Sequence, residues 1–175
     1  MIPSRFILLV CVLAAVSSTA FAQHRTPVAA ATSFYAFDRT HSQIFNRRNV
    51  DARKAWLSAD LYSLFRNELR REDAYLKENP HDKPYFGDGF PFQPIDETCK
   101  AGLRDLHKSL SLKSSFQKGK HAAVNATFAF PKPCKDPDVT TYTIRLIKEK
   151  GGWLIDDVNY EDKHSLKSDL KRKDY

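Results

Sequence analysis

The clearest hydrophobic pattern lies between Thr140 and Tyr160, where two apolar-rich runs flank Gly151 and Gly152. A Gly-Gly pair supplies the positive φ angles that a tight hairpin turn requires. Alternation in the first run puts one face on Tyr142, Ile144 and Leu146 and the other on Thr141, Thr143, Arg145 and Ile147. In the second run one face holds Trp153, Ile155 and Asp157, and the other holds Leu154, Asp156, Val158 and Tyr160. We predict a long antiparallel hairpin that forms the spine of a single sheet.

Two more strands are predicted upstream of the hairpin. A period of two separates Leu110, Leu112 and Phe116 from the polar residues between them. After a turn at Lys118–Lys120, apolar residues fill one face of the clearest half-buried strand, namely Ala122, Val124, Ala126, Phe128 and Phe130. The pattern therefore predicts four antiparallel strands in chain order. Residues 99–107 fit either a short helix or a strand.

Two helices are predicted before the strands. Thr32 or Ser33 caps the first helix, which carries one apolar stripe made of Phe34, Phe37, His41, Ile44 and Phe45. The polar residues 46–55 read as a linker. Ser58 caps the second helix, whose inward residues are Leu61, Leu64, Phe65, Leu69 and Leu76. Asn79-Pro80 ends it, because the residue before proline is displaced from the helical region.

Residues 79–98 contain four prolines and two glycines, which argue against a regular element, but they are too aromatic for a solvated loop. Such a segment folds back over a core or lies across the mouth of a pocket. Its acidic residues are Asp82, Asp88, Asp96 and Glu97, and their spacing differs from that of an EF-hand calcium loop. We interpret them as turn-forming and capping carboxylates.

The N-terminal residues have the features of an export signal. Arg5 precedes an apolar run, and Ala20-Phe21-Ala22 matches the small-x-small pattern, which predicts cleavage after Ala22. The run is shorter than the roughly 20 residues of a membrane-spanning helix. We predict a cleaved signal peptide (1–22), a flexible leader (23–31), one domain (32–161) and a charged, frayed tail (162–175). The bacterial-type signal predicts a periplasmic or secreted protein without a transmembrane segment.

Cleavage removes Cys11 and leaves only Cys99 and Cys134. In an oxidising compartment this pair predicts a disulfide, worth roughly 3–4 kcal/mol in the chain-entropy model. The alternative is a metal site with two thiolate ligands. It lacks both a CxxC spacing and a nearby pair of histidines.

The whole chain has a formal net charge of +7. This charge favours acidic partners or anionic surfaces in general. The basic residues are scattered in small clusters, which indicates a solvated basic surface and no specific nucleic-acid partner. No phosphate loop, nucleophile elbow, HExxH or other cofactor or metal motif is legible.

Asp38 and His41 form the most suggestive polar pair. One helical turn separates them, so their side chains can touch. A carboxylate that orients a histidine facing a pocket is the arrangement of a general base. The alternative is a hydrogen-bonded pair at the edge of the core. Tyr35, Tyr62 and Asp157 are the further candidates, either as ligand-binding residues or as helpers of this pair.

The order of these elements resembles the nuclear transport factor 2-like superfamily, and within it exported bacterial proteins of the DUF3828 type, a domain of unknown function. The matching pieces are Phe34-Tyr35, the stretch 57–61 that opens the second helix, and Gly152–Val158 in the last strand. The resemblance implies an α+β fold in which a curved antiparallel sheet of about four strands wraps two or three helices as a cystatin-like cone. It also implies an inner cavity, which in such proteins is a catalytic site, a small-molecule pocket or a filled core.

Three functions follow as hypotheses. The first is an exported, non-catalytic small-molecule-binding or accessory module of unknown specificity. The second is an interaction or immunity-type envelope protein that binds another protein through the outer face of the sheet, a face that can also carry a homodimer. The third is an acid–base enzyme of the isomerase or dehydratase type, working in the cone cavity. A cavity lined by Asp38 and His41 would favour the enzyme, and a cavity filled by phenylalanine side chains would exclude it.

Overall fold

The computed structural model describes residues 26–94, 109–129, 139–149, 151–160 and 164–173. In chain order the elements are α1 (Pro27–Asp38), α2 (Arg47–Arg53), the 3-10 helix η1 (Lys54–Trp56), α3 (Ala59–Glu78), β1 (Ser111–Lys118), β2 (His121–Ala129), β3 (Val139–Glu149), β4 (Gly152–Asn159) and α5 (Leu166–Leu170). The predicted signal peptide, both candidate disulfide cysteines and residues 99–107 lie outside the described residues.

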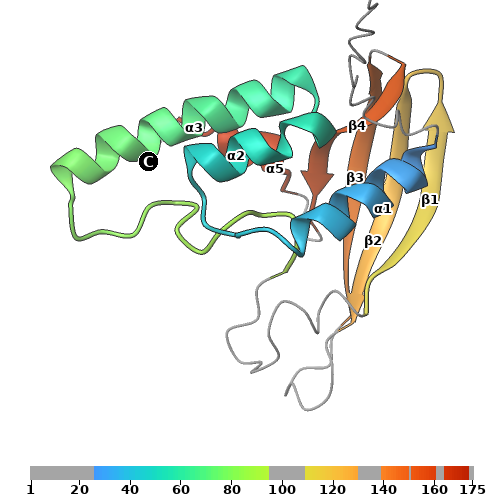
Figure 1. Ribbon diagram of the computed structural model, residues 1–175, viewed down its shortest axis with the longest axis horizontal. Coiled ribbons are helices and arrows are strands. Elements are labelled where there is room, and N and C mark those ends of the chain that lie inside the picture. Colours follow the sequence, from blue (N-terminus) through green and yellow to red (C-terminus); the bar gives the residue numbers. More distant parts are fainter. Residues whose placement is uncertain (1–25, 95–108, 130–138, 150, 161–163, 174–175) are drawn as a thin grey trace, which may run out of the picture.

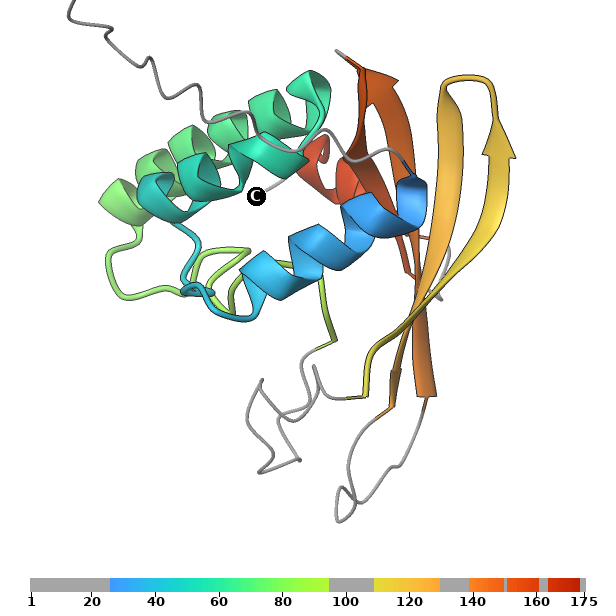
Figure 2. The same ribbon diagram turned by 45° about the vertical axis from the view of Figure 1, so that its right-hand side comes forward.

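The four strands form one antiparallel sheet in the order β1-β2-β3-β4, and the described helices all lie on one side of it (Figures 1 and 2). The α+β class and the curved four-stranded antiparallel sheet are therefore as predicted. Gly119 and Gly151 occupy the turns between strands with φ angles of 59° and 85°, which residues with a side chain rarely adopt. We call the side that faces the helices the inner face and the opposite side the outer face.

Two β-bulges change which side chains reach the inner face. In β1 the register shifts between Ser114 and Phe116, so that Phe116 pairs with Ala123 on the outer face and is 51% exposed. In β4 the shift places Val158 opposite Ile144, so Val158 is buried on the inner face. The predicted alternation was wrong beyond both points, because each bulge adds one residue and reverses the period of two.

Polar N-caps explain where the helices begin. The side chain of Thr26 accepts from the backbone of Ala29 and Pro27 opens α1, so this helix begins well before Thr32 and takes in part of the predicted leader. Asn46 caps α2 by accepting from Asn49, so the predicted linker is largely helical. The predicted helix start at Thr32 or Ser33 and the predicted linker at 46–55 were both wrong for the same reason. Each overlooked a polar cap that has no apolar stripe in the residues after it.

The second predicted helix is confirmed as α3. The hydroxyl of Ser58 accepts from the backbone N–H of Leu61 at 3.1 Å, and the helix ends before Asn79-Pro80. The segment that follows, described as far as residue 94, has no regular secondary structure and folds back over the core. Its buried aromatic residues are Phe86, Phe90 and Phe92.

Aromatic rings fill the space between the helices and the inner face of the sheet. Phe92 packs edge-on against Phe34 of α1 at 4.7 Å, and Phe65 of α3 lies 5.8 Å from Phe92. On the sheet side, the ring of Tyr35 contacts that of Phe128 at 5.8 Å. The interior that the predicted cone would leave as a cavity is a packed aromatic core here.

The C-terminal segment is part of this core. Leu166 and Leu170 of α5 are buried, and Arg172 donates to the buried carboxylate of Glu68 at 2.6 Å while its guanidinium lies over the ring of Tyr85. Ser165 and Ser168 form a capping box that starts the helix. A frayed tail was therefore the wrong prediction for residues 164–173, because Leu166, Leu170 and Arg172 anchor them to the core.

Candidate functional site

Asp38 and His41 do not form the predicted pair. Asp38 ends α1 and is fully buried, where its Oδ1 accepts from Nε of Arg53 at 2.8 Å. The guanidinium of Arg53 also donates to the backbone oxygens of Ser42 and Asn49 and lies 3.9 Å above the ring of Phe90. Asp38 is therefore held in a structural ion pair between α1 and α2.

His41 lies beyond the end of α1 and is exposed. Its ring stacks on that of Phe37 with centroids 3.6 Å apart, and its Nδ1 is within 2.8 Å of the backbone oxygen of Phe37. The hypothesis of a carboxylate-oriented general base in a pocket was wrong. The helix ends before His41, and the carboxylate of Asp38 pairs with Arg53 instead.

The other three candidates lie in separate places. Tyr35 is buried, its hydroxyl donates to the backbone oxygen of Phe92 at 2.8 Å, and burial raises its pKa well above 10.0. The hydroxyl of Tyr62 on α3 donates to Asp51 at 2.7 Å. Asp157 in β4 accepts from the backbone N–H of Lys167 and so helps to hold α5. Each side chain has a structural partner, and no common site gathers them.

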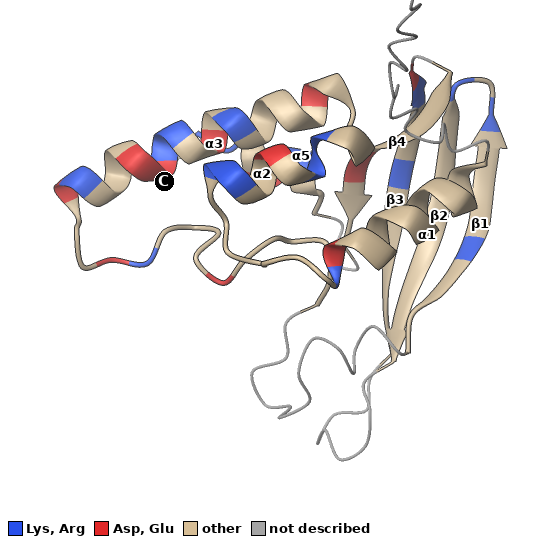
Figure 3. Cartoon of the chain, in the orientation of Figure 1, with Lys and Arg blue, Asp and Glu red and all other residues tan. Residues whose placement is uncertain are grey.

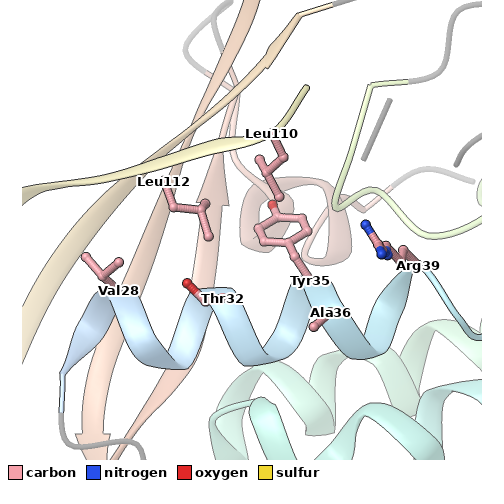
Figure 4. Close-up of a pocket in the computed structure, with 7 residues that line it drawn as sticks. All are labelled: Val28, Thr32, Tyr35, Ala36, Arg39, Leu110 and Leu112. Carbon is pink, nitrogen blue, oxygen red and sulfur yellow. The ribbon is translucent and has the colours of Figure 1, made fainter. Parts of the chain in front are cut away.

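A groove lies between α1 and β1 (Figure 4). Its volume is about 440 Å³, and it is lined by Val28, Thr32, Tyr35, Ala36, Arg39, Leu110 and Leu112. Leu110 and Leu112 line it from the strand side, while Val28 and the guanidinium of Arg39 stand at opposite ends of it on the helix side. Of these residues the sequence pointed only to Tyr35 as a candidate site residue, because the groove arises where two elements distant in the chain pack together.

The outer face of the sheet carries a mixed polar and apolar surface. Strand register places two rows across it, one of Phe116, Ala123, Arg145 and Asp157 and the next of Lys118, His121, Ile147 and Leu154. Nearer the other end of the strands, Ser111, Thr127 and Thr141 form a row of hydroxyl side chains on this face. The hydroxyls of Thr127 and Thr141 lie 3.1 Å apart. Every described helix packs on the other side of the sheet, so none of them covers this face (Figures 1 and 2).

The two edges of the sheet differ. The outward edge of β4 is bridged twice, by Leu57 opposite Ile155 and by Ser165 opposite Asn159. Ser58 also donates its backbone N–H to the oxygen of Ile155 at 2.8 Å. Among the described residues, no backbone bridge reaches the outward edge of β1. That strand is mostly exposed, and its charged residues are all lysines, seen as blue without red in Figure 3.

Two further properties concern the described part of the chain only. It contains no group of three or more His, Cys, Asp or Glu side chains arranged to hold a metal ion. None of its helices combines the length and the apolar character that crossing a bilayer demands.

Comparison with known proteins gives a likeness of fold. No family model and no curated protein matches the chain. A chain in the crystal structure of the type VI native effector–immunity complex Tae3–Tai3 from Ralstonia pickettii is 18% identical, with a TM-score of 0.52. The match covers 79% of this chain and 97% of that one. The selenomethionine form of the same complex gives a TM-score of 0.49 at 18% identity, over 78% and 97% of the two chains. The resemblance to the nuclear transport factor 2-like superfamily stays a prediction.

Proposed function

We propose that this protein is an exported interaction module of the immunity type, which binds another protein through the outer face of its sheet. The observation that carries the proposal is this face, which none of the described helices covers. It presents exposed Phe116 and Arg145 beside the half-buried apolar side chains of Ile147 and Leu154. Aromatic residues and arginine within a partly apolar surface are typical of protein interfaces.

The likeness to a chain from an effector–immunity complex supports the same proposal. The match extends over 97% of that chain, so the shared part is a whole fold and not one motif. At 18% sequence identity the likeness supports a shared fold, and experiment has to find the partner. Export, which an immunity-type envelope protein requires, rests on the predicted signal peptide.

The two competing hypotheses receive less support. The acid–base enzyme needed Asp38 and His41 in one cavity, and each is engaged elsewhere, by Arg53 and Phe37 respectively. A small-molecule module needed an inner cavity, and phenylalanine rings occupy that space. The groove beside α1 is one small-molecule candidate among the described residues.

The test is affinity capture from the source organism with the wild-type protein and with Arg145→Ala. A partner identified by mass spectrometry is then made recombinantly and titrated. We expect binding to weaken about tenfold for Arg145→Ala, because interface arginines are frequent binding hot spots. Arg70→Ala, an exposed arginine on α3, is the matched control and keeps wild-type affinity.

Two results would count against the proposal. One is that no captured protein binds the purified wild-type chain. The other is that the partner binds equally well when Arg145→Ala is combined with Ile147→Ala. A genuine immunity function further requires that the partner is toxic when expressed alone and harmless when expressed with this chain.

A further inference from the structure

We infer that the partner docks by adding an extended strand to the outward edge of β1, and that this strand alternates apolar and acidic side chains. The inference rests on the proposed function in that it assumes a protein partner, and it names where and by what chemistry that partner binds. The two edges of the sheet, the groove beside α1 and the local charge each contribute to it.

The two edges of the sheet differ in how much of their backbone is already paired. The outward backbone of β4 is engaged by Leu57 and Ser165, whereas among the described residues the outward backbone of β1 has no such bridge. An exposed edge presents a row of N–H and C=O groups that an incoming strand can pair with, which is the basis of recognition by strand addition. β1 spans eight residues, long enough for several such bonds.

The groove gives the apolar half of the pattern. An added strand would continue the inner face of the sheet past Leu112, and the side chains it turns inward would lie over the groove between α1 and β1. Leu110 and Leu112 make the strand side of that groove apolar, and Val28 adds an apolar side chain from α1. Side chains such as valine or leucine therefore suit the inward positions.

Charge gives the acidic half. On the outer side of β1 stand Lys113 and Lys118, with Lys120 in the following turn and Arg39 at the end of the groove. Residues 109–122 contain no Asp or Glu, and the one acidic residue of α1, Asp38, is paired with Arg53. Opposite charges on neighbouring strands stabilise their pairing, so acidic side chains suit the outward positions of the partner.

The same lysines argue against a second copy of this chain as the occupant. Two β1 edges paired with each other would bring lysines of like charge together, which destabilises a pair of strands. Lysines and a bulge on an edge are also common devices against self-association. An acidic strand neutralises those lysines, while a second β1 cannot.

The experiment uses two defined peptides, one alternating valine with glutamate and one alternating valine with lysine, each seven residues long and blocked at both ends. Both are titrated into the purified full-length protein, and binding is followed by calorimetry and by amide NMR shifts. We expect only the glutamate peptide to bind, with shifts confined to β1 and the groove-lining part of α1. A glutamate peptide with N-methylated backbone amides should lose binding, because it cannot complete the strand pairing.

Two variants localise the effect. Lys113→Glu with Lys118→Glu should weaken the glutamate peptide at least tenfold. Ala36→Trp, which fills the groove from an exposed position on α1, should do the same, whereas Ala74→Trp, an exposed alanine on α3, should not. Thermal unfolding of each variant confirms that it is folded.

The outcomes separate this inference from the proposed function. Equal binding of both peptides, shifts away from β1, or no binding of the glutamate peptide at about 1 mM would overturn strand addition. A captured partner that loses affinity with Arg145→Ala but binds the double lysine variant like wild type would also overturn it, while leaving the proposed function intact. Loss of that partner with the lysine variants and with Ala36→Trp would support both.

Discussion

The buried polar side chains of this protein hold distant segments together. The carboxylate of Asp38 joins the end of α1 to α2 through Arg53, and the carboxylate of Glu68 joins α3 to the C-terminal segment through Arg172. Arg71 also pairs with Glu68 from the same helix. Burying these charges is costly, so each pair contributes to the specificity of the arrangement more than to its overall stability.

Removing one partner of the Asp38–Arg53 pair should be severe. Arg53→Met leaves a fully buried carboxylate without its counter-ion, and we expect the free energy of unfolding to fall by about 3–5 kcal/mol. The double variant Asp38→Leu/Arg53→Met should lose less than Arg53→Met alone, because it removes the uncompensated charge. Urea unfolding measures both, with the exposed Arg48→Met as the control. A double variant less stable than the single one would refute this account.

Glu72 should give the protein a pH-dependent stability. Its carboxylate is buried and accepts from the backbone N–H of Phe86 at 2.9 Å. Burial, with the nearby charge of Glu68, raises its pKa from 4.5 to about 7. Between these two values the folded protein holds a proton that the unfolded chain has released, so stability falls as pH rises through this window.

Glu72→Gln should remove this effect, since the amide oxygen can still accept from Phe86 and carries no charge. We expect the variant to match wild type near pH 4.5 and to exceed it by about 2–3 kcal/mol at pH 8. Urea unfolding at four pH values between these limits provides the test. Parallel stability profiles for the two proteins would mean that Glu72 does not titrate in this range.

At the level of elements, α5 is an integral part of the domain. Leu166 is fully buried, and the helix is held by Asp157 and by its own capping box. Leu166→Ala should therefore lower the free energy of unfolding by about 2–5 kcal/mol, the range for a leucine truncated in a packed core. Thermal or urea unfolding gives the value, and the exposed Lys171→Ala serves as the control. An effect below about 1 kcal/mol would indicate a loosely attached helix.

Local signals in the sequence predicted several elements well. The glycine at 151 marks the hairpin because residues with a side chain rarely adopt its positive φ. Ser58 marks the start of α3 because its hydroxyl accepts from a backbone N–H that would otherwise lack a partner. The starts of α1 and α2 carried comparable signals at Thr26-Pro27 and Asn46. They were missed because the residues behind these caps have no clear amphipathic stripe.

Features that depend on tertiary contacts were not predictable in this way. Nothing in a period of two announces the bulge before Phe116, and that bulge decides which face of the sheet the ring occupies. The partner of Asp38 is fifteen residues away on another helix, so spacing alone favoured His41. The candidate site, the outer face with the β1 edge, exists only once four strands are aligned.

Across the whole molecule, acidic and basic side chains are unevenly distributed. Two acidic residues of α3 are paired with cations of the C-terminal segment, Asp60 with Lys167 and Glu68 with Arg172. The lysines of β1 have no acidic residue within their own strand or the adjoining turn. Part of the net charge of +7 therefore lies at the β1 edge, where we expect a partner to bind.

The unequal edges of the sheet also limit how large an assembly can grow. A sheet that can be extended on both sides can add subunit after subunit and form a filament. Here Leu57 and Ser165 occupy part of the β4 edge, so we expect strand addition on the β1 side only. We therefore expect a complex with one copy of each protein and no filament.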